Sequence, residues 1–335
     1  MLEPHSQNPY WARLVIVAYN SGNDLQTCID YLSAQVFQNF EVVIVDNASS
    51  DAAVEELSLP NDRYRILRLD ENIGFAGGSN CGADKAQTEW IITLNPDSWP
   101  KDNWLEELYI ASQENPNFSM LSSTIVQNDA PEYLDSFGDF FSIFGVARNA
   151  GRNTHIKKCP SYLCETFSPS GAAAAYRTVT FEAYGGFDTD FFCYMEDIDL
   201  GYRLRMMGER CLQCPKAIVH HIGSSSVGKF SDFKFYHSYK NNFAVILKNT
   251  PLLLLFLMVP LFLSSQLWWL FRNRKNVGHS ARKKGMKEGL RLSCRNFRKR
   301  RVIQKNKVIS SFTLAKCLSW SSKDLKASNF FYWPL

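Results

Sequence analysis

The chain has 335 residues, of which 45% are hydrophobic and 21% charged. It is long enough for one large α/β domain with an appendage, and too apolar for a wholly disordered chain. Its nine cysteines are too few and too irregularly spaced for a disulfide scaffold. The net charge of +4 hides an asymmetry, because residues 1–271 contain 19 Lys and Arg against 31 Asp and Glu, whereas residues 272–335 contain 18 against 2. The sequence therefore predicts an acidic globular part followed by a basic C-terminal tail.

The first 12 residues are polar and contain two prolines. They lack the basic start and the apolar run of a secretory signal peptide. We therefore expect the acidic part to stay in the cytosol with its thiols reduced.

Four short apolar runs in the first hundred residues are predicted strands, at residues 14–18, 42–45, 64–69 and 90–94. The first run is continuous and rich in β-branched residues, which is typical of a strand buried on both faces.

Helix-like segments separate these runs. Leu25, Ile29 and Leu32 recur at helical spacing, Ser50 or Asp51 is placed to open a second helix, and a third helix is expected around residues 76–86. Alternating strands and helices predict an α/β fold, with a mostly parallel sheet and helices on both faces.

Polar residues follow directly after the four predicted strands, namely Asn20, Asp46, Asn72 and Asp97. Open α/β sheets bind ligands at the carboxyl ends of their strands. For each residue alone, an Asx-turn or a helix cap is the favoured explanation. Together they favour a nucleotide-type ligand.

Residues 118–177 are irregular, aromatic and rich in turns. We interpret them as a loop-rich wall over the sheet edge that recognises an acceptor. An ordinary aromatic core is the alternative.

An acidic cluster, Glu196, Asp197 and Asp199, precedes Arg203. Three acids this close cannot all be buried unless they are paired or hydrogen-bonded. Asp199 and Arg203 are spaced to pair along a helix, which leaves Asp197 facing a cleft as a general base. The alternative is a charged first helical turn favoured by the helix dipole.

Asp97 and a histidine at residues 220–221 are candidate metal ligands. A carboxylate at a strand end can hold a divalent cation that neutralises a diphosphate, and a histidine at a later strand end can join it. Asn95-Pro96-Asp97 is also a good turn sequence, so this signal is weak by itself.

Residues 252–271 are uncharged and long enough to span a bilayer as a helix of about 30 Å. A single crossing would export the basic tail, against the positive-inside tendency. Insertion into the membrane surface or a helical hairpin is therefore favoured, with a true span and a buried soluble helix as alternatives.

Taken together, these motifs resemble the inverting family 2 glycosyltransferases, in particular the rhamnosyltransferase-like branch that builds bacterial surface polysaccharides. The resemblance runs from residue 14 to about residue 251. Its motifs lie at residues 17–20, 45–49, 72–82, 95–97, 170–173, 185–188 and 196–199, at Arg203 and at residues 221–225.

The resemblance implies a GT-A fold, which is Rossmann-like, and a role for each matching residue. Nucleotide and donor binding falls to Ala18, Asn20, Asp46, Asn72, Gly74, Gly78, Asn80 and Asn95. Asp97 and His221 are the implied metal ligands, with His220 as the alternative histidine, and Asp197 is the implied catalytic base, supported by Glu196, Asp199 and Arg203. Asn95 stands where many members have Asp, which removes one formal charge beside the metal.

The expected organisation is an N-terminal extension at 1–12, a GT-A catalytic domain at 13–250, an apolar membrane-associated segment at 251–271 and a basic tail at 272–335. The expected activity is a metal-dependent (Mg²⁺ or Mn²⁺) transfer of a sugar, with rhamnose as one candidate, from a nucleotide-diphosphate sugar to a lipid-linked or polysaccharide acceptor. We expect it at the cytoplasmic face of the inner membrane, on an anionic membrane surface. The alternatives are a catalytically silent membrane-bound scaffold and, less favoured, nucleic-acid binding through the basic tail; no nucleic acid is expected as a partner.

Overall fold

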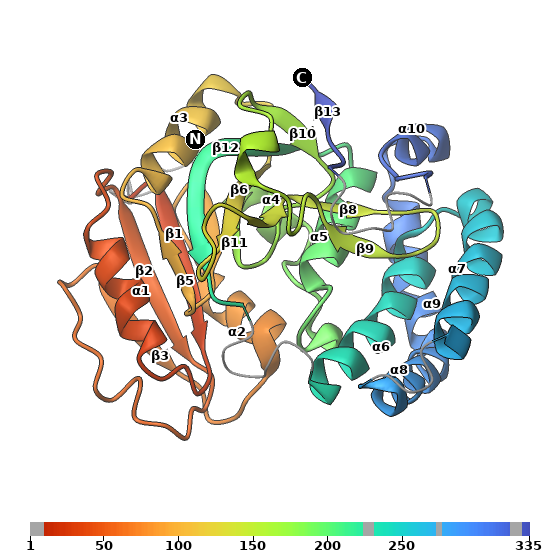
Figure 1. Cartoon of the computed structure of the whole chain (residues 1–335), viewed down its shortest axis with the longest axis horizontal. Helices are drawn as coiled ribbons and strands as arrows, with labels where there is room; N and C mark the ends of the chain where they lie inside the picture. Colours follow the sequence, from red (N-terminus) through yellow and green to blue (C-terminus); the bar gives the residue numbers. More distant parts are fainter. Residues whose placement is uncertain (1–9, 224–230, 273–276, 322–329) are drawn as a thin grey trace, which may run out of the picture.

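A computed structural model describes residues 10–223, 231–272, 277–321 and 330–335. One large sheet with helices on its two faces forms one side of the molecule, and the C-terminal helices gather on the other side (Figure 1).

The large sheet has the strand order β13-β10-β12-β6-β11-β4-β1-β2-β3, with β5 added beside β12 and β7 beside β6. Its strands are β1 Ala12–Ala18, β2 Phe40–Asp46, β3 Tyr64–Arg68, β4 Trp90–Leu94, β5 Ser98–Pro100, β6 Met120–Gln127, β7 Leu134–Phe137, β10 Cys164–Thr166, β11 Ala173–Arg177, β12 Cys211–His221 and β13 Trp333–Pro334. A separate two-stranded ribbon pairs β8 Asp139–Phe141 with β9 Ala147–Asn149.

The four predicted strands are confirmed as β1 to β4, which pair in parallel. β1 is buried along its whole length, as its continuous apolar run predicts. β11 is antiparallel to both β4 and β6, while β12 is parallel to β6. β12 therefore runs in the same direction as β4, and its last residue, His221, reaches the same edge of the sheet as the ends of β1 to β4.

Helices cover both faces of the sheet, as predicted. α1 Asp24–Ser33 and α3 Trp104–Glu114 pack on one face, and α2 Gly74–Ala83, α4 Thr178–Ala183 and α5 Glu196–Met206 pack on the other. Two short 3₁₀ turns lie at Ile156–Lys158 and Thr189–Phe191.

Two expectations about this part of the chain are wrong. Residues 47–63 form turns rather than a helix, since Val54 is the only fully buried apolar side chain there and Pro60 closes the segment. Residues 118–177 are more than a wall over the sheet edge, because β6 and β11 lie in the middle of the sheet. Phe137, Phe140 and Phe141 are fully buried, so the aromatic-core alternative holds for these residues.

The chain after β12 forms helices: α6 Asp232–Asn249, α7 Leu252–Arg272, α8 His279–Arg291, α9 Ser293–Lys305 and α10 Ser311–Lys316. α8 packs closely against α6. Gly285 and Gly289 permit this approach, because a side chain at either position would collide with the backbone oxygen of Tyr236 or Lys240. The described part of the basic segment is therefore folded onto the body of the molecule (Figure 1).

Candidate functional site

The predicted site residues gather at one edge of the sheet, because five strands run the same way and end there. Asn20, Asn72 and Asp97 follow β1, β3 and β4, while Asp46 ends β2 and His221 ends β12. These residues form two groups along the edge. The residues at the ends of β1 to β3 (Asn20, Asp46 and Asn72) form the first group, which we call the rim, and Asp97 after β4 and His221 of β12 form the second group.

Asp97 and His221 form the centre of the second group. β5 pairs with the end of β12, with Ser98 opposite His221, so the turn after β4 brings Asp97 against the imidazole. Nε2 of His221 lies 3.4 Å from Oδ1 of Asp97 and 3.4 Å from Nδ2 of Asn95. Nδ1 of His221 lies 2.9 Å from Oδ2 of Asp135. His221 is thus held between two carboxylates.

The electrostatics follow from this placement. Burial alone lowers the pKa of His221, but the hydrogen bonds and charges of Asp135 and Asp97 outweigh it and raise the pKa to about 10. Burial raises the pKa of Asp135, yet His221 and Arg152, whose Nη2 lies 3.1 Å from the carboxylate, lower it to about 2. The space between Asp97 and Asp135 therefore favours a positive charge.

This group fits a divalent metal that is shared with a substrate. Because Nδ1 of His221 is bonded to Asp135, its Nε2 is turned toward Asp97. A carboxylate bonded to the other ring nitrogen is the usual way in which a metal-ligating histidine is oriented. Within the described residues no cluster of three His, Cys, Asp or Glu side chains encloses a cation. Mg²⁺ sites are commonly built in this way, from one or two protein ligands completed by substrate phosphates and water. His220, the alternative ligand, pairs with Trp99 on the other face of the strand.

The loop before α5 places Asp197 through a strained backbone. Phe192, Tyr194 and Met195 all have positive φ, at 64°, 68° and 74°, a conformation that non-glycine residues rarely adopt. The oxygen of Phe192 accepts a hydrogen bond from the N–H of Ala76 at 3.1 Å. A side chain at Gly74 would stand 2.3 Å from that oxygen, so a glycine is needed where this loop meets α2.

The carboxylate of Asp197 is held by main-chain donors. The N–H of Gly171 donates to Oδ2 at 2.8 Å, and the N–H of Ile198 donates to Oδ1 at 2.7 Å. The next residue, Ala172, accepts a hydrogen bond from the N–H of Asn95 at 3.0 Å. The segment around residues 171–172 therefore joins Asp197 directly to the turn that carries Asp97.

Three acids share the buried region around Asp197. Burial raises the pKa of Asp197, although the N–H groups of Gly171 and Ile198 oppose the shift. Burial and then the charge of Asp197 raise the pKa values of Glu196 and Asp139 well above those of exposed carboxyls. Because three neighbouring carboxylates cannot all ionise, the one with the best N–H donors, Asp197, is favoured as the anion.

The predicted Asp199–Arg203 pair forms, with Nε of Arg203 2.9 Å from Oδ2 of Asp199. Asp199 is fully buried and also bonds Nζ of Lys248 at 2.8 Å and Nδ2 of Asn249 at 2.8 Å. Lys248 reaches Oδ2 of Asp188 at 2.5 Å as well. This network fixes α5, and so its N-terminal turn, against α6.

The rim at β1 and β2 is built from side chains bonded to the main chain. Oδ1 of Asn20 accepts from the N–H of Ser50 at 2.7 Å, and Asn20 itself has a φ of 50°. The carboxylate of Asp46 accepts from the N–H of Ser49 at 3.0 Å and from Arg68 at 3.1 Å. Ala18, which pairs with Asp46 in the sheet, completes this corner. The local turn interpretation thus describes the Asp46–Ser49 contact, whereas Asn20 bonds the main chain of a segment thirty residues away.

The glycine-rich stretch closes the rim. Oδ1 of Asn72 accepts from Asn47 at 2.9 Å and from the N–H of Gly74 at 2.9 Å. Asn80 lies away from the strand ends, where its amide donates to the oxygen of Phe187 at 2.8 Å and accepts from the N–H of the same residue at 2.9 Å. A side chain at Gly78 would stand 2.8 Å from Val17, so this glycine lets α2 approach β1.

Sequence reasoning missed three residues of the site, namely Asp135, Asp139 and Lys248. Asp135 and Asp139 stand four residues apart in an aromatic run, and acids in such a run are a signal of paired burial. Lys248 gives no such signal, since a lysine in an amphipathic helix is usually solvated. Residues 224 and 225 of the last sequence motif lie outside the described residues.

Comparison with known proteins identifies a matching family model and relatives by sequence. Residues 14–177 match the model of the family described as Glycosyl transferase family 2. The chain is 29% identical over 131 residues to Glycosyltransferase GlyG of Streptococcus pneumoniae serotype 4, covering 38% of this chain and 42% of that protein. It is 26% identical over 238 residues to the N-acetylglucosaminyl-diphospho-decaprenol L-rhamnosyltransferase of Mycobacterium tuberculosis, covering 64% and 77%. The chain thus spans less than half of the first relative.

A solved structure shares the fold. The mannosyltransferase PcManGT of Pyrobaculum calidifontis, in complex with GDP-Man and Mn²⁺, aligns with a TM-score of 0.53 and 14% identity, covering 94% of this chain and 90% of that one. At this identity the likeness shows the fold alone. It confirms the GT-A architecture that the motifs imply.

Proposed function

Since residues 14–177 match the Glycosyl transferase family 2 model, we propose that the chain is an inverting, metal-dependent glycosyltransferase of bacterial cell-surface glycan synthesis. The observation that supports this best is the link between the two acidic groups. Gly171 bonds Asp197, and its neighbour Ala172 bonds the backbone of Asn95, two residues before Asp97. One short segment thus fixes both groups beside the same sheet edge.

Asp197 is the proposed catalytic base. Inverting transfer is a single displacement at the anomeric carbon, so the base takes the proton of the acceptor hydroxyl on the side opposite the leaving diphosphate. The N–H donors of Gly171 and Ile198 orient the carboxylate. Its raised pKa brings it nearer to the working pH than that of an exposed aspartate, which makes it a stronger base.

Asp97 and His221 would hold the divalent cation, with Asp135 orienting the imidazole through Nδ1. When bound, such a cation supplies positive charge that stabilises the departing diphosphate. The solved PcManGT complex contains Mn²⁺ and GDP-Man, which supports the choice of a divalent metal and a nucleotide sugar.

The donor and acceptor are proposed from the relatives. The mycobacterial relative is named for rhamnosyl transfer onto a diphospho-decaprenol-linked N-acetylglucosamine. We therefore take rhamnose as the first sugar to test and a lipid-linked glycan as the first acceptor. The strand-end corner at Ala18, Asn20 and Asp46 is the proposed nucleotide pocket, and the Asn72–Gly74 turn is proposed for the diphosphate side.

α7 is the proposed attachment to the membrane, lying in the interface rather than crossing it. It is the one described helix long and apolar enough to cross a membrane. Leu255, Phe262 and Gln266 are buried against the body along its length, whereas Leu253 and Phe256 are 73% and 75% exposed. A helix that is packed on one face along its length cannot have lipid all round, so its free apolar face fits the surface of a bilayer.

The basic segment suits an anionic membrane better than nucleic acid. Part of its charge is used inside the protein, since Arg295 and Lys299 pair with Asp190 and Arg300 bonds main-chain oxygens. We expect the chain to sediment with vesicles that contain phosphatidylglycerol, and Phe256→Glu to abolish this. Val179→Glu, at a site 72% exposed on α4, is the matched control. A gel shift on duplex DNA without vesicle binding would favour the nucleic-acid alternative.

The experiment that tests the proposed activity uses the full chain with dTDP-, UDP- and GDP-sugars, Mg²⁺ or Mn²⁺, and a polyprenyl-diphosphate-linked N-acetylglucosamine. We expect release of nucleotide diphosphate that needs acceptor and stops with a chelator, and a product whose anomeric configuration is opposite to that of the donor by NMR. A chain that binds no donor and releases nothing under any condition would support the silent scaffold instead.

A further inference from the structure

A hollow lies on the reverse face of the β5–β12 ribbon. Neighbouring residues on a strand point to opposite faces, so Ser98 and His221 face the metal group, whereas Trp99 and His220, which are paired in register, face away from it. On that side a hollow of about 380 Å³ opens between α1 and the ribbon. The proposed chemistry uses neither this hollow nor its side chains.

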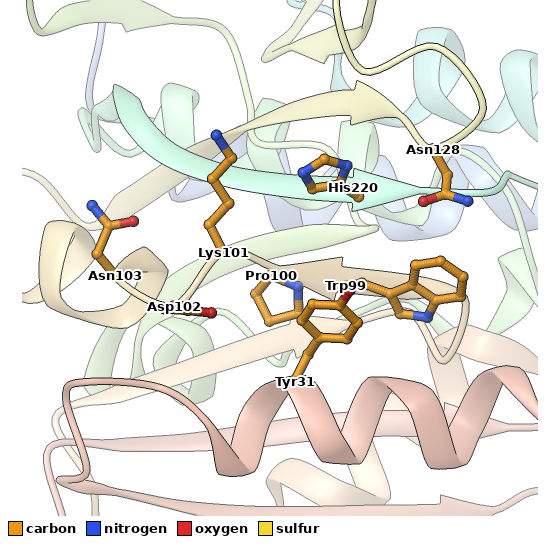
Figure 2. A pocket seen from close by; sticks show the side chains of 8 residues that line it. All are labelled: Tyr31, Trp99, Pro100, Lys101, Asp102, Asn103, Asn128 and His220. Atoms are coloured by element: carbon orange, nitrogen blue, oxygen red, sulfur yellow. The ribbon is translucent and has the colours of Figure 1, made fainter.

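The floor of the hollow is aromatic. The rings of Tyr31 and Trp99 lie within 5° of parallel, with their centroids 6.0 Å apart. Figure 2 shows the two rings next to each other with their faces turned the same way, in line with their stacked arrangement. Tyr31 is 42% exposed. Nε1 of Trp99 is buried and has no hydrogen-bond partner among the described residues.

Polar side chains surround this floor. His220 and Asn128 stand above the rings, and Lys101 lies to one side (Figure 2). In the described part of the chain none of these three side chains forms a hydrogen bond or an ion pair. An aromatic floor beneath free donors and acceptors presents an apolar face and a polar rim to the same ligand.

We propose that this hollow is a binding site for a pyranose ring of the glycan, separate from the site of transfer. A pyranose has an apolar C–H face that stacks on aromatic rings and hydroxyls at its edge that both donate and accept. The volume lies at the lower end of the range of about 300–1,000 Å³ for small-molecule sites. The inference rests on the proposed function, because a glycosyltransferase on a growing glycan has saccharide units beyond the one that reacts.

The hollow and the metal group share the same strands. The N–H of Asn128 bonds the oxygen of His221 at 3.0 Å, and the N–H of Lys101 bonds the oxygen of Ile218 at 3.0 Å. A saccharide unit held here would keep the glycan on the enzyme near the edge of the sheet where transfer occurs. Its loss would weaken the binding of long acceptors without changing the chemistry on short ones.

The test measures saccharide binding without turnover. Saturation-transfer NMR and calorimetry with methyl glycosides of rhamnose, glucose, galactose and N-acetylglucosamine, and with cellobiose, are run on the full chain with nucleotide diphosphate and Mn²⁺ present to fill the donor site. We expect at least one saccharide to bind, Tyr31→Ala and Trp99→Ser each to weaken its Kd tenfold or more, and Trp99→Phe to retain most of the affinity. Tyr162→Ala, at another exposed tyrosine, is the matched control.

Equal binding by wild type and Tyr31→Ala would overturn the proposal, as would an absence of binding for every saccharide tested. Binding of UMP or inorganic phosphate that depends on Tyr31 would also overturn it, in favour of a nucleotide site. Failure of the proposed function is separate, since it appears as an absence of nucleotide diphosphate release by the wild type.

Discussion

Replacing Lys248 with methionine should destabilise the protein by about 3 kcal/mol, because each of two buried carboxylates loses one of its cationic partners. The side chain of Lys248 is 1% exposed, and its amino group contacts Asp188 at 2.5 Å and Asp199 at 2.8 Å. Methionine matches the length of the aliphatic stem, so the substitution removes the charge with little change in packing.

The magnitude follows from what stays in place. Breaking a buried ion pair by removing one partner costs about 3–5 kcal/mol. Asp199 keeps Arg203 at 2.9 Å, and Asp188 keeps Lys299 at 2.5 Å, so neither carboxylate is left without a cation. The expected cost therefore lies at the lower end of that range.

Urea denaturation followed by tryptophan fluorescence measures this free energy of unfolding. Lys216→Met, at an exposed position on β12, is the control and should stay within about 0.5 kcal/mol of wild type. A double-mutant cycle with Asp188→Asn should give a coupling energy of at least about 1 kcal/mol. The reasoning is refuted if Lys248→Met costs no more than the Lys216 control.

Three further predictions test the site and its surroundings. Gly171→Ala puts a Cβ 3.2 Å from Oδ2 of Asp197, so steady-state kinetics should show a lower kcat with donor binding retained; an unchanged kcat would contradict the placement of the base. Asp135→Asn removes the partner that orients His221 and should weaken Mn²⁺ binding about 10- to 100-fold, measured by EPR titration; equal affinity would exclude this role. Burial raises the pKa of Asp188, but Lys248 and Lys299 outweigh it and hold the pKa well below its usual value, so its contribution to stability is present above the unfolded pKa of about 3.9 and is lost as the pH falls below it. Between pH 7 and pH 3 the free energy of unfolding should therefore depend less on pH in Asp188→Asn than in wild type. Identical pH profiles for the two proteins would refute the linkage.

The first half of the sheet could be predicted because its signals are local. The apolar runs of β1, β2 and β4 are continuous, and each ends at a polar turn. β6 and β11 were hidden, because β6 contains Ser122, Ser123 and Thr124, which are buried between neighbouring strands. Their burial depends on partners distant in the chain, and no local pattern reports it.

The candidate site was predictable where a residue follows a strand and obscure where it depends on pairing across the chain. Asp97 and His221 could be named from their positions at strand ends. Asp135, 86 residues before His221 in the chain, could be recognised only after β7 was placed beside β6. Likewise, the sequence of the basic C-terminal segment showed its charge but not its packing. Arg295 and Lys299 of α9 pair with carboxylates in the loop before α5, which is distant in the chain.

The central claim is that Asp197 takes the acceptor proton from a donor sugar held at the Asp97 side of the same edge. Measuring donor affinity and turnover together on Asp197→Asn tests it most directly, with Glu182→Gln, an exposed acid on α4, as the control. We predict that Asp197→Asn binds the nucleotide sugar as wild type does and loses about 10²- to 10⁴-fold in kcat. Wild-type turnover in Asp197→Asn would contradict the account.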